Sequence, residues 1–258
     1  MKILIIGAGK MGKFFCDLFT SHGHQVALFD IRPENLLYTF NCLRFASLDE
    51  IDGFEPDLLL NAATVKYTIP AFEAVIPHLP EHTVIGDIAS VKTGLPEFYA
   101  RSGRRFVSTH PMFGPTFASL ANLGNENAII IKEGDEEWKA FFRNLYRELQ
   151  LNIVDYTFEE HDVTTAYSLS LPFASTLVFA GVMKHQEAPG TTFKRHMAIA
   201  HGLLSEDDYL LQEILFNPNS SERLTAVRER LAELQEIVDS RDADRMKDFL
   251  NSARRNIE

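Results

Sequence analysis

The chain has 258 residues, of which 45% are hydrophobic and 24% are charged, the proportions of a soluble globular protein. That length allows one large domain or two ordinary ones. A net charge of −11 at pH 7 argues against nucleic acid or an anionic membrane as the main partner.

We expect neither a signal peptide nor a membrane-spanning segment in this sequence. The apolar run ILII near the N-terminus is too short for the core of a signal peptide, and we expect no segment of membrane-spanning length. The two cysteines, Cys16 and Cys42, fit no disulfide or metal pattern, which favours reduced structural thiols. A cytoplasmic protein without a metal site is therefore predicted.

Strand-like and helix-like segments alternate through the first 156 residues. Short apolar runs predict strands at residues 2–7, 25–30, 56–63, 83–89, 104–111, 127–132 and 151–156. Helical spacing of apolar residues predicts helices at residues 10–23, 69–79 and 136–149. Such alternation is typical of a mostly parallel sheet covered by helices, so residues 1–156 are predicted to form an α/β domain.

The remainder of the chain is predicted to be helical. In TFEE, Thr157 and Glu160 have the spacing of a capping box, which predicts a helix start. A long apolar helical run follows over residues 162–183, and the tail from about residue 220 carries an apolar stripe of Leu224, Val227, Leu231, Leu234 and Val238. Such a stripe packs against another helix, from the same chain or from a partner. Residues 157–258 are therefore predicted to form a second, all-helical domain.

The motif GAGKMG lies between the first predicted strand and the first predicted helix. Gly7 permits a tight turn, Gly9 lets backbone approach a pyrophosphate, and Gly12 lets the helix pack on the strand. The helix N-terminus offers unpaired amides and a partial positive charge to the phosphates, which makes Lys10 and Met11 candidate contacts as well. The motif predicts dinucleotide binding; the alternative is a structural turn without a nucleotide.

Asp30 closes the second predicted strand, 18 residues after Gly12. A carboxylate at that point accepts hydrogen bonds from an adenosine ribose and repels a 2′-phosphate, so NAD is the predicted cofactor. Arg32 follows two residues later and leaves NADP open.

Three polar residues follow predicted strands whose carboxyl ends share one edge of the sheet. Ser90 and Lys92 follow the strand that contains Asp87, and His110 ends the next strand, directly before Pro111. Pro111 favours extended backbone at His110. A dinucleotide beside an imidazole indicates hydride transfer with His110 as the base, because imidazole titrates near physiological pH. Structural roles stay open for all three: a packed histidine, a turn-capping serine and a solvated lysine.

The motifs GAGKMG, GDIASVK and HPMFGP, in that order and followed by EEHD, resemble those of the prephenate and arogenate dehydrogenases of tyrosine biosynthesis. The resemblance covers most of the chain and is densest over residues 84–117. It implies a Rossmann-type doubly wound domain followed by an all-α dimerisation domain, hence a homodimer with the active site between the domains. It also implies that His110 is the catalytic base, and that Ser90 hydrogen-bonds the substrate's ring hydroxyl and the histidine. The implied reaction is oxidative decarboxylation of prephenate to 4-hydroxyphenylpyruvate with reduction of NAD.

The sequence departs from the family pattern in its helical part. Many members have a second histidine where this chain has SLPFAS, with Ser170 and Phe173. The arginine that binds the substrate's side-chain carboxylate is not found at its place in RHMAIAHGLLSEDD. Arg195, His196 or His201 are the candidate substitutes, with helix packing as the alternative role of the two histidines. Neither a regulatory domain nor a fused mutase is expected.

Three functions follow, from two classes of protein. Prephenate dehydrogenase is the leading hypothesis, and arogenate dehydrogenase or another small hydroxyacid oxidoreductase of similar architecture is the second. A nucleotide-sensing regulator would keep GAGKMG and Asp30 but would not need Ser90 together with His110. The sequence does not separate prephenate from arogenate, because their keto and amino groups meet the part of the chain that diverges.

Overall fold

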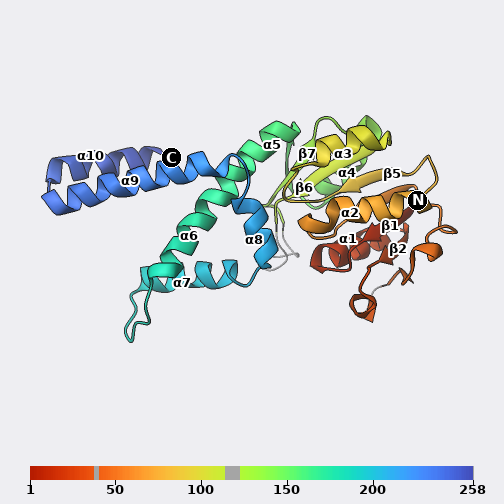
Figure 1. Ribbon diagram of the computed structural model, residues 1–258, viewed down its shortest axis with the longest axis horizontal. Coiled ribbons are helices and arrows are strands. Elements are labelled where there is room, and N and C mark those ends of the chain that lie inside the picture. Colours follow the sequence, from red (N-terminus) through yellow and green to blue (C-terminus); the bar gives the residue numbers. More distant parts are fainter. Residues whose placement is uncertain (38–40, 114–122, 258) are drawn as a thin grey trace.

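The computed structural model describes residues 1–37, 41–113 and 123–257, as a part that contains a sheet followed by a helical part (Figure 1). Within these residues, eight strands form one sheet in the order β3-β2-β1-β4-β5-β6-β7-β8. Their bounds are β1 (Lys2–Ile6), β2 (Gln25–Phe29), β3 (Leu43–Phe45), β4 (Leu58–Asn61), β5 (Val84–Asp87), β6 (Phe106–Pro111), β7 (Asn127–Ile131) and β8 (Asn152–Tyr156). The order is that of a doubly wound Rossmann-type sheet, and the predicted fold class is confirmed.

Strand direction sets where the functional residues meet. All neighbouring strands from β3 to β6 are parallel. β7 runs antiparallel to β6, with His110 opposite Ile129, and β8 is parallel to β7. The mostly parallel sheet predicted from the sequence is thus confirmed. The sequence does not predict the antiparallel direction of β7 or the short strand β3. The carboxyl ends of β1, β4, β5 and β6 lie along one edge of the sheet.

Helices cover both faces of the sheet: α1 (Lys10–Ser21), α2 (Val65–Val75), α3 (Leu95–Ser102) and α4 (Glu136–Glu148). Successive residues of β1 point to opposite faces of the sheet. Ile3 and Leu4, which follow one another in β1, are both completely buried. Ile3 lies in a core with residues of α1 and α4, such as Phe15 and Phe142. Leu4 lies in a second core with residues of α2 and α3, such as Phe72. The two cores fix the helices on the sheet and so hold its carboxyl edge in place.

The helical part contains α5 (Phe158–Thr165), α6 (Leu171–Val182), α7 (Thr191–Leu203), α8 (Asp208–Leu215), α9 (Ser220–Ser240) and α10 (Ala243–Arg255). Its predicted start is confirmed, because the Thr157 hydroxyl accepts from the amide of Glu160 at 3.1 Å and the Glu160 carboxylate accepts from the amide of Thr157 at 2.7 Å. The predicted domain boundary, after residue 156, falls in the connection between β8 and α5.

The expectation that no segment reaches membrane-spanning length is wrong. A π-helical turn at Ala166–Ser170 joins α5 to α6, so that one helix runs over the 25 residues Phe158–Val182, with a mean hydropathy of 1.3 in its most apolar window. By length and composition alone this helix could cross a membrane. Only 17% of that window is buried within the chain, so the helix presents an apolar surface.

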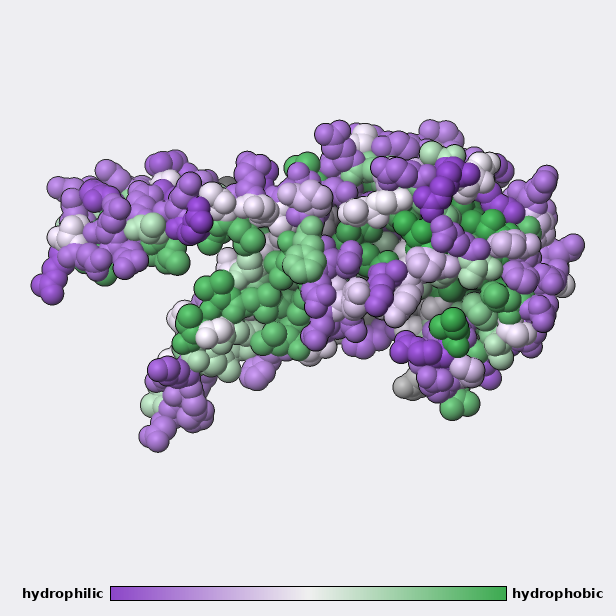
Figure 2. Space-filling view, in the orientation of Figure 1, coloured by the Kyte–Doolittle hydropathy of each residue, from purple (hydrophilic) through white to green (hydrophobic). Residues whose placement is uncertain are grey.

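α9 and α10 project from the body as a helical arm (Figure 1). On α9 the predicted apolar stripe is largely uncovered: Leu224 is 38% exposed, Leu231 58% and Val238 56%. Figure 2 shows hydrophobic residues gathered on α6 between this arm and α7, where Val178 is 61% exposed and Val182 72%. Val227 and Leu234 are half-buried, because α9 packs against α6, the π-helical turn and α10, so packing within the described part of the chain covers the stripe only in part.

Candidate active site

The glycine-rich turn after β1 is shaped by two close approaches. Gly7 has a φ of +96°, which side-chain-bearing residues rarely adopt, and a Cβ there would lie 2.8 Å from the carbonyl oxygen of Ala62. A Cβ at Gly12 would lie 1.8 Å from the carbonyl oxygen of Gly7. At Gly9, by contrast, a Cβ would meet no atom within 4 Å. Gly7 and Gly12 therefore serve the fold, while Gly9 faces open space that a ligand can occupy.

The N-terminus of α1 points into this space. Gly9 caps the helix without a side-chain hydrogen bond, so its first-turn amides are not satisfied by the cap. The amides at a helix N-terminus and the helix dipole favour an anion at this position. Lys10 and Met11, in the first turn, are exposed and half-buried respectively. Open space at Gly9 and a helix end without a side-chain cap fit the pyrophosphate of a dinucleotide.

Asp30 connects the turn to the end of β2. It is 7% exposed; its Oδ2 accepts from the amide of Ala8 at 2.8 Å, and its Oδ1 accepts from the amide of Arg32 at 2.8 Å. Each carboxylate oxygen has a second acceptor position, so ribose hydroxyls can still bind. The negative charge lies where the sequence predicts it, and the Arg32 residue itself is exposed.

Lys92 lies inside the protein and not at the surface where a substrate could contact it. Its side chain is completely buried, forms an ion pair with the buried Asp87 and donates to the carbonyl oxygen of Thr109 at 2.8 Å. Tyr99 donates to the other oxygen of Asp87 at 2.6 Å. Burial lowers the pKa of Lys92, opposed by the Asp87 charge, and burial raises the pKa of Tyr99. The predicted contact between Lys92 and substrate has no support from this geometry, which gives the ammonium an internal role.

His110 is at the carboxyl end of β6 and is 5% exposed. Its Nδ1 lies 3.0 Å from Nε2 of His161, on α5. Burial, then the neighbouring His161 and Lys92, hold the pKa of His110 well below its usual range, so its ring is neutral at pH 7. Nε2 makes no hydrogen bond within the described residues, and it is not among the fully enclosed unpaired atoms there. A neutral imidazole thus presents one nitrogen to accessible space.

Ser90 does not orient His110 in this structure. It is half-buried and makes no hydrogen bond to any described residue. The contact with His110 that the resemblance assigns to Ser90 is made instead by His161, which belongs to the motif EEHD at the start of the helical part. No spacing in the sequence connects positions 110 and 161, which are brought together by the fold.

The two predicted substrate residues of α7 lie outside the cluster around His110. Both residues are exposed, and the side chains of Arg195 and His201 make no hydrogen bond or ion pair within the described part of the chain. His196, also exposed, contacts the carbonyl oxygen of Thr192 at 3.0 Å. Ser170, where many relatives have a histidine, is buried and donates to the carbonyl oxygen of Ile214 at 2.7 Å.

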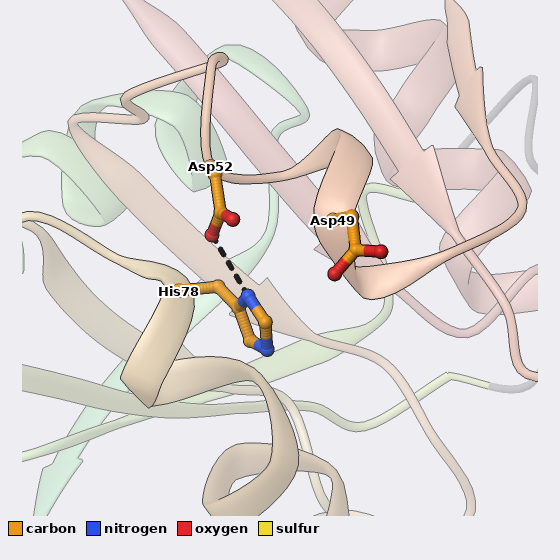
Figure 3. A group of neighbouring side chains, drawn as sticks. All are labelled: Asp49, Asp52 and His78. Atoms are coloured by element: carbon orange, nitrogen blue, oxygen red, sulfur yellow. Dashed lines mark hydrogen bonds and ion pairs between the residues drawn. The ribbon is translucent and has the colours of Figure 1, made fainter.

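One cluster has the composition of a metal site but lies elsewhere. Nδ1 of His78 is 2.8 Å from Oδ1 of Asp52, and Asp49 is beside them (Figure 3). Asp52 and His78 precede β4 and β5, at the amino ends of these strands and so at the edge opposite His110. Both aspartates are exposed, and exposed acidic groups of this kind are common without a metal.

Residues 20–152 match the family described as prephenate dehydrogenase, nucleotide-binding domain. The matched stretch is more than half of the chain and includes β6 with His110. The chain belongs to the prephenate dehydrogenase family. The glycine-rich turn precedes the matched stretch, so its assignment to the nucleotide depends on the geometry described above.

Two curated relatives of this family member are equally distant in sequence. A probable arogenate/prephenate dehydrogenase of Methanocaldococcus jannaschii is 22% identical over 93% of the chain, and T-protein of Haemophilus influenzae is 22% identical over 88% of it. The chain spans 57% and 58% of the length of these two proteins.

Solved structures of the family share the whole fold. Prephenate dehydrogenase from Aquifex aeolicus, in complex with hydroxyphenyl propionate and NAD+, has a TM-score of 0.83 and 20% identity over 100% of this chain and 98% of its own. Synechocystis arogenate dehydrogenase has a TM-score of 0.74 and 18% identity over 99% of this chain and 98% of its own. At these identities the likeness shows the fold, including the helical part.

Proposed function

We propose that this chain catalyses oxidative decarboxylation of prephenate to 4-hydroxyphenylpyruvate with NAD, as a step of tyrosine biosynthesis. The observation that carries the proposal is the neutral, enclosed imidazole of His110 at the same sheet edge as the glycine-rich turn. β1 and β6 are three strand positions apart, about 14 Å at the usual strand spacing. An extended dinucleotide bound at the turn can bridge that distance.

The residues that would hold NAD are the backbone around Gly9, the N-terminus of α1 and the Asp30 carboxylate. The cofactor supplies the acceptor for a hydride. Asp30 supports NAD over NADP, because its charge repels a 2′-phosphate at the ribose position.

His110 acts as the base of the proposed reaction. Its Nε2 takes the proton of the substrate's ring hydroxyl while hydride leaves the carbon that bears this hydroxyl, and the ring carboxylate departs as carbon dioxide. The electron pair of the broken carbon–carboxylate bond completes the aromatic ring, and the phenolate so formed recovers the proton from His110. Formation of the aromatic ring drives the step, so the residues of the chain mainly position the substrate and remove one proton. Arg195 and His201 remain the proposed partners of the substrate's side-chain carboxylate.

Arogenate is the second candidate substrate, since the similar proteins include a probable arogenate/prephenate dehydrogenase and an arogenate dehydrogenase. A nucleotide-sensing regulator would not need a buried base beside the nucleotide. The deciding experiment follows the absorbance of reduced nicotinamide with prephenate and with arogenate, each with NAD and with NADP. We expect prephenate with NAD to give the highest kcat/KM. If neither substrate reduces either cofactor, the enzyme proposal fails and the sensor is favoured.

We further propose that the chain forms a homodimer through its helical part. Support comes from the uncovered apolar surfaces of α6 and α9, which are too extensive to face water as continuous seams. A second copy of the chain would cover both.

A further inference from the structure

A second histidine, His161, contacts His110 and has no role in the reaction proposed above. His161 is completely buried, and its ring centroid lies 5.2 Å from that of His110 at an interplanar angle of 57°. His110 comes from β6 and His161 from α5, so the pair joins the sheet to the helical part. Asn217, which follows α8, donates to the carbonyl oxygen of Asp162 at 3.0 Å and helps to fix α5.

The hydrogen bonds of this pair determine which nitrogen carries each proton. Nδ1 of His161 lies 3.1 Å from Oδ1 of Asp162, and a carboxylate oxygen can only accept, so this Nδ1 carries the proton. Burial lowers the pKa of His161, and the ring is therefore neutral, with a lone pair on Nε2. Nδ1 of His110, 3.0 Å away, must then be the donor. The lone pair of His110 consequently lies on Nε2, the nitrogen that faces accessible space.

Charged groups around the pair agree with this arrangement. The buried ammonium of Lys92, held by Asp87, disfavours a positive charge on both rings. The Asp162 and Asp87 carboxylates favour a positive charge on His161, but burial outweighs them. The Asp162 side chain is 25% exposed and lies at the wall of a surface cleft of about 560 Å³ between α3 and α5. It thus keeps contact with water, whereas His161 is completely buried.

We propose that His161 is a positioning residue which, together with Asp162, holds His110 in the tautomer that has its lone pair on Nε2. The inference depends on the proposed function for its catalytic consequence. When Nε2 takes the substrate's proton, His110 becomes an imidazolium whose Nδ1–H remains bonded to the lone pair of His161. A charge-assisted hydrogen bond of this kind is stronger than the neutral one, so the pair also stabilises the base after proton transfer.

The first test changes the acceptor that faces His110. His161→Leu removes it, whereas His161→Gln can place a carbonyl oxygen near the position of Nε2. We expect kcat of the Leu variant to fall by between about 10-fold and 10⁴-fold, the upper value being the loss that a wrong tautomer causes. KM and NAD affinity should change little, and the Gln variant should recover much of the rate. His82→Leu, at an exposed histidine, is the matched control and should keep normal kcat.

The second test reverses the chain of hydrogen bonds. In Asp162→Asn the amide can donate to Nδ1 of His161, which places the proton of His161 on Nε2 and the proton of His110 on its own Nε2. The base is then lost without removal of either ring, and kcat should fall by at least about 100-fold. A normal kcat in both His161→Leu and Asp162→Asn would overturn the proposal.

The tautomer itself can be measured without substrate. Proton–nitrogen correlation spectra of the unmutated protein with ¹⁵N-histidine distinguish a protonated Nδ1 from a protonated Nε2, and His110→Asn identifies the signal. We expect His110 to be protonated on Nδ1, and to change in Asp162→Asn. A proton on Nε2 in the unmutated protein would contradict the inference even if the variants fail to fold. The spectrum remains decisive if neither prephenate nor arogenate is a substrate, so the two proposals fail separately.

Discussion

Nδ1 of His110 and Nε2 of His161 lie 3.0 Å apart, in a contact that ties the end of β6 to the first turns of α5. The position of the candidate base therefore depends on where the helical part begins. That start is fixed by the capping box of Thr157 and Glu160. The local signal fixes where α5 begins, and the fold as a whole brings His161 to His110, 51 positions away.

His110→Asn keeps a similar shape at the end of β6 but cannot take the proton. We expect kcat to fall by roughly 10²–10⁴-fold, the usual contribution of a positioned base, with little change in KM or NAD affinity. Steady-state kinetics with prephenate and NAD, together with cofactor titration by fluorescence, test this. Near-normal kcat would leave His110 as a structural residue.

The pH dependence of the rate follows from the direction of the His110 pKa. The base must be neutral to act, so the rate rises with pH as the imidazole loses its proton. Because burial, His161 and Lys92 hold the pKa of His110 well below its usual range, the midpoint of that rise should lie below pH 6.5. A profile of kcat/KM against pH measures the midpoint of this rise. A midpoint at or above pH 6.5 that disappears in His110→Asn would show that the enclosure of the ring is lost in solution.

Much of the sheet can be predicted because isoleucine-rich runs such as KILIIG and NAIIIK bury both faces of a strand. β3 is not predictable in this way, since Leu43–Phe45 has only three residues and Leu43 is 46% exposed. The reversal of β7 is equally hidden, because side chains alternate in the same way in parallel and antiparallel strands.

The site is only partly predictable from the sequence. GAGKMG and Asp30 are close in sequence to the strands that place them, and the structure puts them where the motif predicts. Lys92 looks like a solvated cation in the sequence, and only the fold shows that its side chain is buried and paired with Asp87. The contact between His110 and His161 needs the whole fold, because no local pattern connects them.

Gly9 and Gly12 differ in the space around them, which predicts different outcomes when each is replaced by alanine. Gly12→Ala would force a Cβ to within 1.8 Å of the Gly7 carbonyl oxygen, so the free energy of unfolding should fall by roughly 1–3 kcal/mol and Tm by roughly 2–12 °C. Gly9 has a φ of −71° and free space around it, so Gly9→Ala should keep Tm and weaken NAD binding. Calorimetry and cofactor titration separate the two. Unchanged NAD affinity in Gly9→Ala would argue that the phosphates bind elsewhere.

We expect Asp30 to determine the choice between the two cofactors. Asp30→Ala should weaken NAD by about 10- to 100-fold, the value of hydrogen bonds to a charged group, and should relieve the repulsion of NADP. Asp30→Asn is the matched variant, because its carbonyl can still accept from the amide of Ala8 while the charge is gone. Dissociation constants for both cofactors should show a relative gain of NADP in both variants. An unmutated protein that already prefers NADP would show that Arg32 decides instead.

The apolar stripe of α9 predicts the assembly. Leu231, 58% exposed, lies at the middle of the stripe, so Leu231→Lys should place a charge in the proposed interface. Light scattering at micromolar concentration should give twice the 29.2 kDa chain mass for the unmutated protein and a shift toward one chain mass for Leu231→Lys. Glu229→Lys, two positions away and therefore on the opposite side of α9, should remain dimeric. A single chain mass for the unmutated protein, or its sedimentation with lipid vesicles in place of self-association, would show that something other than a second copy covers α6 and α9.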